Sequence, residues 1–160
     1  MVPSRRQANH YQEVEIRTAN PLQLIVMLYD GAIQSLHQSG ERLRQGDIEG
    51  RTRAANRALA IISELQASLN FEAGGQISAS LDSLYGYMSR QIFAAGAQQT
   101  DEPLAEVVSL LKTLRSAWEQ LAARAQQAAA VSGLPPGADA GLLKTGTDDS
   151  VQPASLNVSC

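Results

Sequence analysis

Apolar residues recur at helical spacing along most of the chain, in four long stretches separated by short breaks. The stretches cover residues 21–45, 48–69, 76–98 and about 101–131. Apolar residues repeating every three or four positions are typical of an α-helix with one buried face. The breaks contain residues that end and begin helices, namely Gly46-Asp47, Gly74-Gly75, and Thr100-Asp101 followed by Pro103. Each stretch therefore predicts one helix.

Four helices of similar length with short connections favour packing between antiparallel neighbours. The pattern predicts an all-α fold, an antiparallel up-down bundle of four long helices over residues 20–131. Residues 1–19 are only weakly periodic and are predicted to form a short N-terminal cap segment. In residues 132–160, Gly, Pro, Ser, Thr and Asp dominate and the apolar stripe stops, which predicts a disordered C-terminal tail.

The same spacing predicts which residues of each helix face the core. The first helix contributes Leu22, Ile25, Tyr29, Ile33 and Leu36. The second contributes Ile48, Ala55, Leu59, Ile62 and Leu69, with Ile61 and Leu65 beside them. The third contributes Ile77, Leu81, Leu84, Tyr85, Met88 and Ile92. The fourth contributes Leu104, Val107, Val108, Leu111, Leu114, Trp118 and Leu121.

The first helix, which begins in the segment NPLQLIVMLYDGAIQSL, is apolar on more than one side. Beyond its core face it carries a second row about 120° away, formed by Leu24, Leu28, Gly31 and Ser35 with Met27 at the edge. Glycine inside a helix costs up to about 1 kcal/mol relative to alanine, so Gly31 indicates that another segment approaches closely. Two interpretations remain open. The row packs on a neighbouring helix, or it forms a groove that receives a partner segment.

Composition and charge argue against several classes of function. The 13 basic and 16 acidic residues give a net charge of −3, without the broad basic field of nucleic-acid-binding proteins. No segment reaches roughly 18 uninterrupted apolar residues, so no membrane insertion is expected. The N-terminal stretch MVPSRRQANHYQEVE lacks the apolar core of an ordinary signal peptide. The single cysteine, Cys160, excludes an intramolecular disulfide and fits a reducing cytoplasm.

Catalytic and metal-binding chemistry is sparse in this sequence. A di-iron site in a helical bundle needs Glu-x-x-His pairs, and the chain contains none. We therefore expect no metal, no cofactor and no catalysis. An exposed histidine on a four-helix bundle is also the arrangement of a phosphotransfer domain, so His37 leaves that alternative open beside a solvated surface histidine. A generic helical scaffold without any groove is a further alternative.

Five motifs follow one another in an order that points to one family. They are Tyr11, TANPLQLIVMLYDGAI at residues 18–33, IISELQASLNFEAGGQIS at 61–78, LDSLYGYM at 81–88 and EVVSLLKTLRSAW at 106–118. Together they resemble the FliS family, the flagellin-specific export chaperones of bacteria. The resemblance covers about residues 8–121 and does not extend into the tail.

The resemblance implies a cytoplasmic helical bundle that binds the C-terminal segment of flagellin. Such a chaperone prevents premature polymerisation and delivers flagellin to the flagellar export gate, by stoichiometric sequestration and without catalysis. Combined with the second row of the first helix, it predicts a flagellin-binding set of Tyr11, Leu24, Met27, Leu28, Gly31 and Ser35. For Tyr11 two roles remain open, because its segment either covers the groove in the free protein or contacts flagellin directly.

Overall fold

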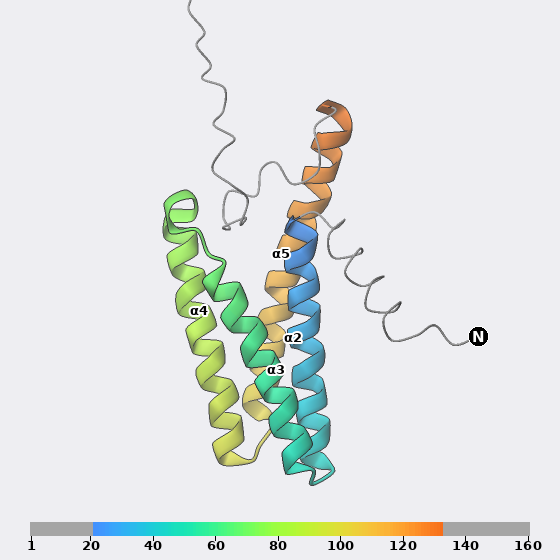
Figure 1. The fold of residues 1–160 in the computed structure, drawn as a ribbon, viewed down its shortest axis with the longest axis vertical. Helices are drawn as coiled ribbons and strands as arrows, with labels where there is room; N and C mark the ends of the chain where they lie inside the picture. The colour runs from blue at the N-terminus through green and yellow to red at the C-terminus, as the bar shows by residue number, and fades with distance from the viewer. Residues whose placement is uncertain (1–20, 133–160) are drawn as a thin grey trace, which may run out of the picture.

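The computed structural model describes residues 21–132, which form four helices packed side by side (Figure 1). They are α2 (Pro21–Arg44), α3 (Ile48–Ala67), α4 (Phe71–Gln98) and α5 (Glu102–Ser132). The all-α prediction is confirmed. The expected cap segment at 1–19, including Tyr11, and residues 133–160 of the expected tail lie outside the described residues.

The connection between α2 and α3 forms as its residues predict. Gly46 adopts a φ of +73°, a left-handed conformation that ends α2 at little steric cost. The amide of Gly46 donates to the carbonyl of Leu43 at 3.0 Å, and the amide of Asp47 donates to that of Arg42 at 2.9 Å. The Asp47 carboxylate then accepts from the amide of Gly50 at 2.8 Å and caps α3. One short segment thus satisfies the ends of both helices.

The start of α4 differs from the sequence expectation. The segment 70–75 was expected to be a turn before a helix beginning at residue 76, but helix begins at Phe71. Asn70 causes this, because its side-chain oxygen accepts from the amide of Ala73 at 3.0 Å. A kink follows at Gly75, whose φ of 49° and ψ of −122° suit only glycine. Helix α3 correspondingly ends at Ala67, two residues before the expected position.

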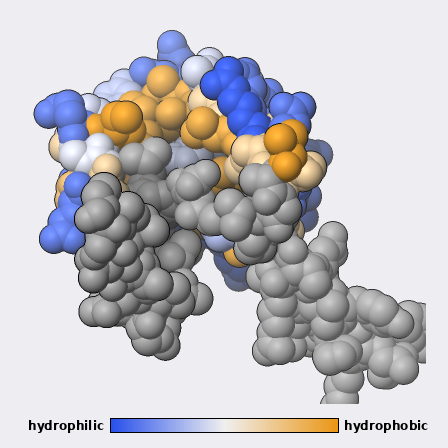
Figure 2. Space-filling view, turned by 90° about the horizontal axis from the view of Figure 1, so that it is seen from above, coloured by the Kyte–Doolittle hydropathy of each residue, from blue (hydrophilic) through white to orange (hydrophobic). Residues whose placement is uncertain are grey.

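The helices form a four-membered ring in which α2 and α4 each pack against α3 and α5 (Figure 1). Successive helices run antiparallel, and the last turns of α5 project past the ends of its neighbours. At the end where α2 begins, hydrophobic residues gather between the helices, and hydrophilic residues occupy the rim (Figure 2). The predicted core face of α2 is confirmed, since Leu22, Ile25, Tyr29, Ile33 and Leu36 are all buried.

Three residues predicted to lie in the core are exposed instead. Ile48 is 61% exposed because it is the first residue of α3 and lies at the connection. Ile77 is 58% exposed because it follows the Gly75 kink, after which Ser78 is the buried residue and donates to the carbonyl of Asn70 at 2.8 Å. Leu121 is 41% exposed, whereas the neighbouring Ala122 is buried. Periodicity alone does not show how these ends are turned.

The centre of the bundle holds a polar cluster of three aromatic side chains, Tyr29, Tyr85 and Trp118. All three are buried, and they come from α2, α4 and α5 respectively. The two phenol groups hydrogen-bond to each other, which links the diagonal helices α2 and α4. The indole Nε1 of Trp118 donates to the phenol oxygen of Tyr29 at 3.1 Å. Burial raises the pKa of both phenols above the ordinary value of 10.0.

Candidate partner-binding groove

The end of the second row of α2 that contains Gly31 and Ser35 lies on the side of the helix that faces α3. Gly31 and Ser35 line an open groove of about 520 Å³ between these helices, called here the α2–α3 groove. Its other lining residues are Gln34, Gln38, Arg57, Ala60 and Ile61. The hydroxyl of Ser35 donates to the carbonyl of Gly31 at 2.8 Å, so it is satisfied by its own helix. This end of the row therefore presents a small surface of low polarity.

The close approach that Gly31 indicated is made by the chain itself. A Cβ atom added at Gly31 would lie 3.2 Å from Cδ1 of Ile61 on α3, closer than ordinary van der Waals contact. The glycine therefore lets α3 pack tightly against α2 at this level. Of the two interpretations left open by the sequence, the packing on a neighbouring helix applies to Gly31. The α2–α3 groove opens at this contact, and both Gly31 and Ile61 line it.

The other three described residues of the proposed set lie nearer the start of α2. Met27 is 43% exposed and is one of the large hydrophobic residues that lie on the surface. Leu24 and Leu28 are half-buried, and Leu28 packs against the core. This end of the row is therefore apolar and only partly covered by the residues that the structure describes. Tyr11 lies outside those residues, so the structure does not place it.

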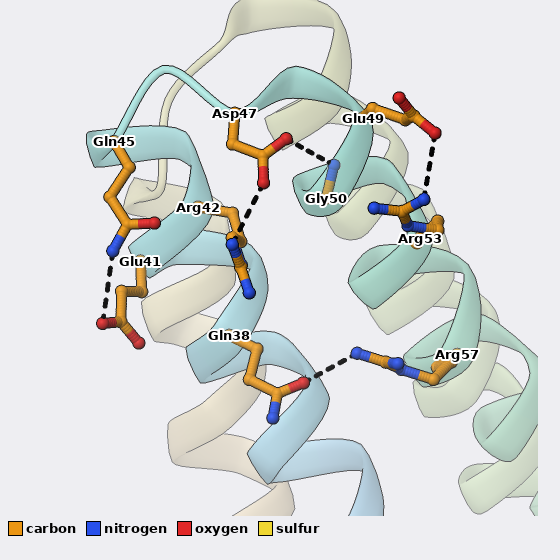
Figure 3. A network of polar contacts seen from close by, with 9 residues as sticks. All are labelled: Gln38, Glu41, Arg42, Gln45, Asp47, Glu49, Gly50, Arg53 and Arg57. Carbon is orange, nitrogen blue, oxygen red and sulfur yellow. Dashed lines mark hydrogen bonds and ion pairs between the residues drawn. The ribbon is translucent and has the colours of Figure 1, made fainter.

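A second, polar cleft, which the sequence did not predict, continues the α2–α3 groove toward the α2–α3 connection. This arginine cleft has a volume of about 490 Å³ and is lined by Gln38, Glu41, Arg42, Gln45, Gly50, Arg53, Ala54 and Arg57. Figure 3 shows polar side chains from both helices along it, with Arg57 of α3 reaching across to Gln38 of α2. The spacing of Arg53 and Arg57, one turn apart on α3, was the available signal. The contribution of α2 could not be seen without the packing.

His37, the residue of the phosphotransfer alternative, is exposed. It lines a different cleft, of about 270 Å³ between α2 and α5, with Gly40, Arg44, Asp101 and Glu102 among its neighbours. Within residues 21–132, no three histidine, cysteine or acidic residues are grouped so that they could hold a metal ion. None of the four described helices is long and apolar enough to cross a membrane.

Comparison with known proteins places nearly all of the bundle in one family. The family model described as flagellar protein FliS matches residues 4–126. The chain belongs to the FliS family. It is 37% identical over 114 residues to the flagellar secretion chaperone FliS of Salmonella typhimurium, covering 71% of this chain and 84% of that one. It is 34% identical over 107 residues to FliS of Vibrio cholerae, covering 67% and 79%.

A third relative gives the same answer. The chain is 32% identical over 110 residues to FliS of Bacillus subtilis, covering 69% of this chain and 81% of that one. The resemblance noted from the sequence motifs is thereby confirmed. FliS proteins are flagellar secretion chaperones and not enzymes, so the family decides against the phosphotransfer alternative for His37.

Proposed function

We propose that this FliS-family protein binds the C-terminal segment of flagellin in the cytoplasm and keeps it from polymerising before export. An amphipathic flagellin segment would lay its apolar face on the start of α2 and in the α2–α3 groove. Release would follow at the flagellar export gate. The observation that carries the proposal is the apolar surface around Leu24, Met27 and Leu28, which continues into an open groove.

The physical basis is the removal of apolar surface from water on both partners. Burying apolar area is favourable by roughly 25 cal/mol per Å². Ordering a flexible segment opposes this gain by several kcal/mol, so the contact has to be extensive. A surface that runs from Leu24 to Ser35 follows α2 for about three turns, long enough to hold a helical segment. The action is stoichiometric, because each bound chaperone covers the apolar face of one flagellin segment.

Met27 offers a direct test, since Gln has a similar shape and helix propensity but a polar end. Isothermal titration with a peptide spanning the flagellin C-terminal segment is expected to show about tenfold weaker binding for Met27→Gln. Phe93→Gln is the matched control, because Phe93 is a 66% exposed apolar residue on α4, outside the groove. Equal affinity losses in the two variants would contradict the placement, and no binding by the unmodified chain would contradict the function.

Tyr11, in the segment before α2, is also proposed to take part in flagellin binding, in one of two ways. If that segment covers the groove in the free protein, Tyr11→Ala speeds association with flagellin, because less of the protein is held closed. If Tyr11 contacts flagellin directly, the same change speeds dissociation and leaves association unchanged. Stopped-flow binding separates the two roles, and unchanged rates in both directions would remove Tyr11 from the site.

A further inference from the structure

The surface between α2 and α3 changes its chemistry along its length. Toward the start of α2, the α2–α3 groove is lined by Gly31, Ala60 and Ile61 together with the uncharged polar residues Gln34 and Ser35. Toward the connection it opens into the arginine cleft, whose lining has three arginines and one acidic residue, Glu41. Gln38 and Arg57 line both parts and mark the point where they meet. A segment following this surface passes from mainly apolar surroundings to charged ones.

The three arginines of the cleft differ in how their charges are balanced (Figure 3). A nitrogen of Arg42 lies 3.2 Å from a carboxylate oxygen of Asp47, and Arg53 lies 2.9 Å from Glu49. Arg57 instead donates to the amide oxygen of Gln38 at 2.7 Å. Within residues 21–132, no carboxylate lies within 4.0 Å of its guanidinium. Among the residues that the structure describes, the charge of Arg57 is therefore met by a neutral amide and not by an acid.

A carboxylate is the group that would complete this arrangement. Guanidinium and carboxylate form two parallel charge-assisted hydrogen bonds, which are roughly twice as strong as bonds between neutral groups. An incoming carboxylate would displace the amide oxygen of Gln38 from Arg57 and take its place as a stronger hydrogen-bond acceptor. Arg42 and Arg53 each keep a carboxylate of their own, so their charges are already balanced within the cleft. Arg57 is thus the residue of the three that is best prepared for an incoming acid.

We propose that the arginine cleft binds an acidic side chain of the same flagellin segment whose apolar face occupies the α2–α3 groove, with Arg57 as its partner. This inference rests on the proposed function. The continuity of the two parts through Gln38 and Arg57 favours one occupant over two separate partners. Gly31 and Gln38 are about two helical turns apart on α2, or about 10 Å. A helical partner would therefore place its acid about two turns from its central apolar contact, on the same face.

The test uses fluorescence anisotropy with a labelled peptide of the flagellin C-terminal segment and the full-length chaperone. Arg57→Gln is expected to weaken binding about 10- to 100-fold, as loss of a hydrogen bond to a charged group does, and to reduce the salt dependence of binding. Arg90→Gln is the matched control, because it removes the same charge from an exposed position on α4. It is expected to change the affinity less than twofold. Unfolding temperatures of both variants check that the fold is unchanged.

Peptides in which each Asp or Glu is changed in turn to its amide identify the acidic partner. One of them should lose as much affinity as Arg57→Gln causes, and combining the two changes should add little further loss. Equal affinities of Arg57→Gln and Arg90→Gln, or losses that simply add for every acidic position, would overturn the proposal while leaving flagellin binding intact. If the unmodified chain fails to bind the peptide, the proposed function fails with it. Should Arg57→Gln lower the unfolding temperature, Arg57→Lys keeps the charge without the fork and is expected to restore only part of the affinity.

Discussion

The buried cluster of Tyr29, Tyr85 and Trp118 makes a sharp prediction about the stability of the bundle. An indole N–H can only donate, so Trp118 occupies the oxygen of Tyr29 as an acceptor. The proton of Tyr29 is then available to donate to Tyr85. Tyr29 thus stands between the other two groups, and its hydroxyl serves both. Tyr to Phe changes remove these hydroxyls with almost no change in volume, so they leave no large cavity.

The expected losses follow from counting the buried polar groups that each change leaves without a partner. Each such group costs about 1–3 kcal/mol. Tyr85→Phe deprives only the Tyr29 hydroxyl of a hydrogen-bond partner, so it should destabilise by about 1–3 kcal/mol. Tyr29→Phe deprives both the Trp118 indole and the Tyr85 hydroxyl, so it should cost about twice as much. In the double variant only the indole is deprived, so it should be more stable than Tyr29→Phe alone.

Urea unfolding followed by far-UV circular dichroism measures the free energy of unfolding for the three variants. Tyr87→Phe is the control, because that phenol donates to Glu106 at 2.7 Å on the exposed surface, and little or no loss is expected. An unchanged dependence on urea concentration shows that the variants unfold like the parent protein. The reasoning is refuted if Tyr85→Phe costs as much as Tyr29→Phe, or if the two losses add in the double variant.

Two further predictions concern the pH dependence of stability and the kink in α4. Because burial raises the pKa of Tyr29 and Tyr85 above 10.0, the unfolded chain releases phenol protons that the folded chain keeps. The contribution of these two groups to the free energy of unfolding should therefore be constant below about pH 10 and fall above it by up to about 1.4 kcal/mol per pH unit for each tyrosine. Tyr85→Phe should show a shallower fall. Urea titrations at several alkaline pH values measure this dependence, and equal pH slopes for the parent protein and Tyr85→Phe would contradict it. Gly75→Ala should destabilise by about 1–3 kcal/mol through backbone strain alone, since an added Cβ meets no atom within 4 Å. Gly86→Ala, in regular helix, should be neutral or slightly stabilising, and thermal unfolding that ranks the two glycine variants the other way would show that the kink is not under strain.

The sequence alone was enough to predict the helices and the inner face of α2. Helical periodicity and end signals are local properties, so the burial of Ile25 and Leu36 and the turn at Gly46 follow from neighbouring residues. The motifs were likewise enough to indicate the family. The start of α4 was less accessible, because the cap by Asn70 and the kink at Gly75 compete within one short segment.

The tertiary structure decided which surfaces of those helices meet. Gly31 signalled a close approach, but only packing identifies Ile61 as the residue that makes it. Tyr29, Tyr85 and Trp118 read as ordinary apolar stripe positions, and their hydroxyl and indole groups pair only because three distant helices converge. The arginine cleft has the same origin, since Arg57 of α3 meets Gln38 of α2 across an interface. Periodicity determines which face of a helix is buried, whereas partners across helices depend on axial register and rotation, which single helices do not encode.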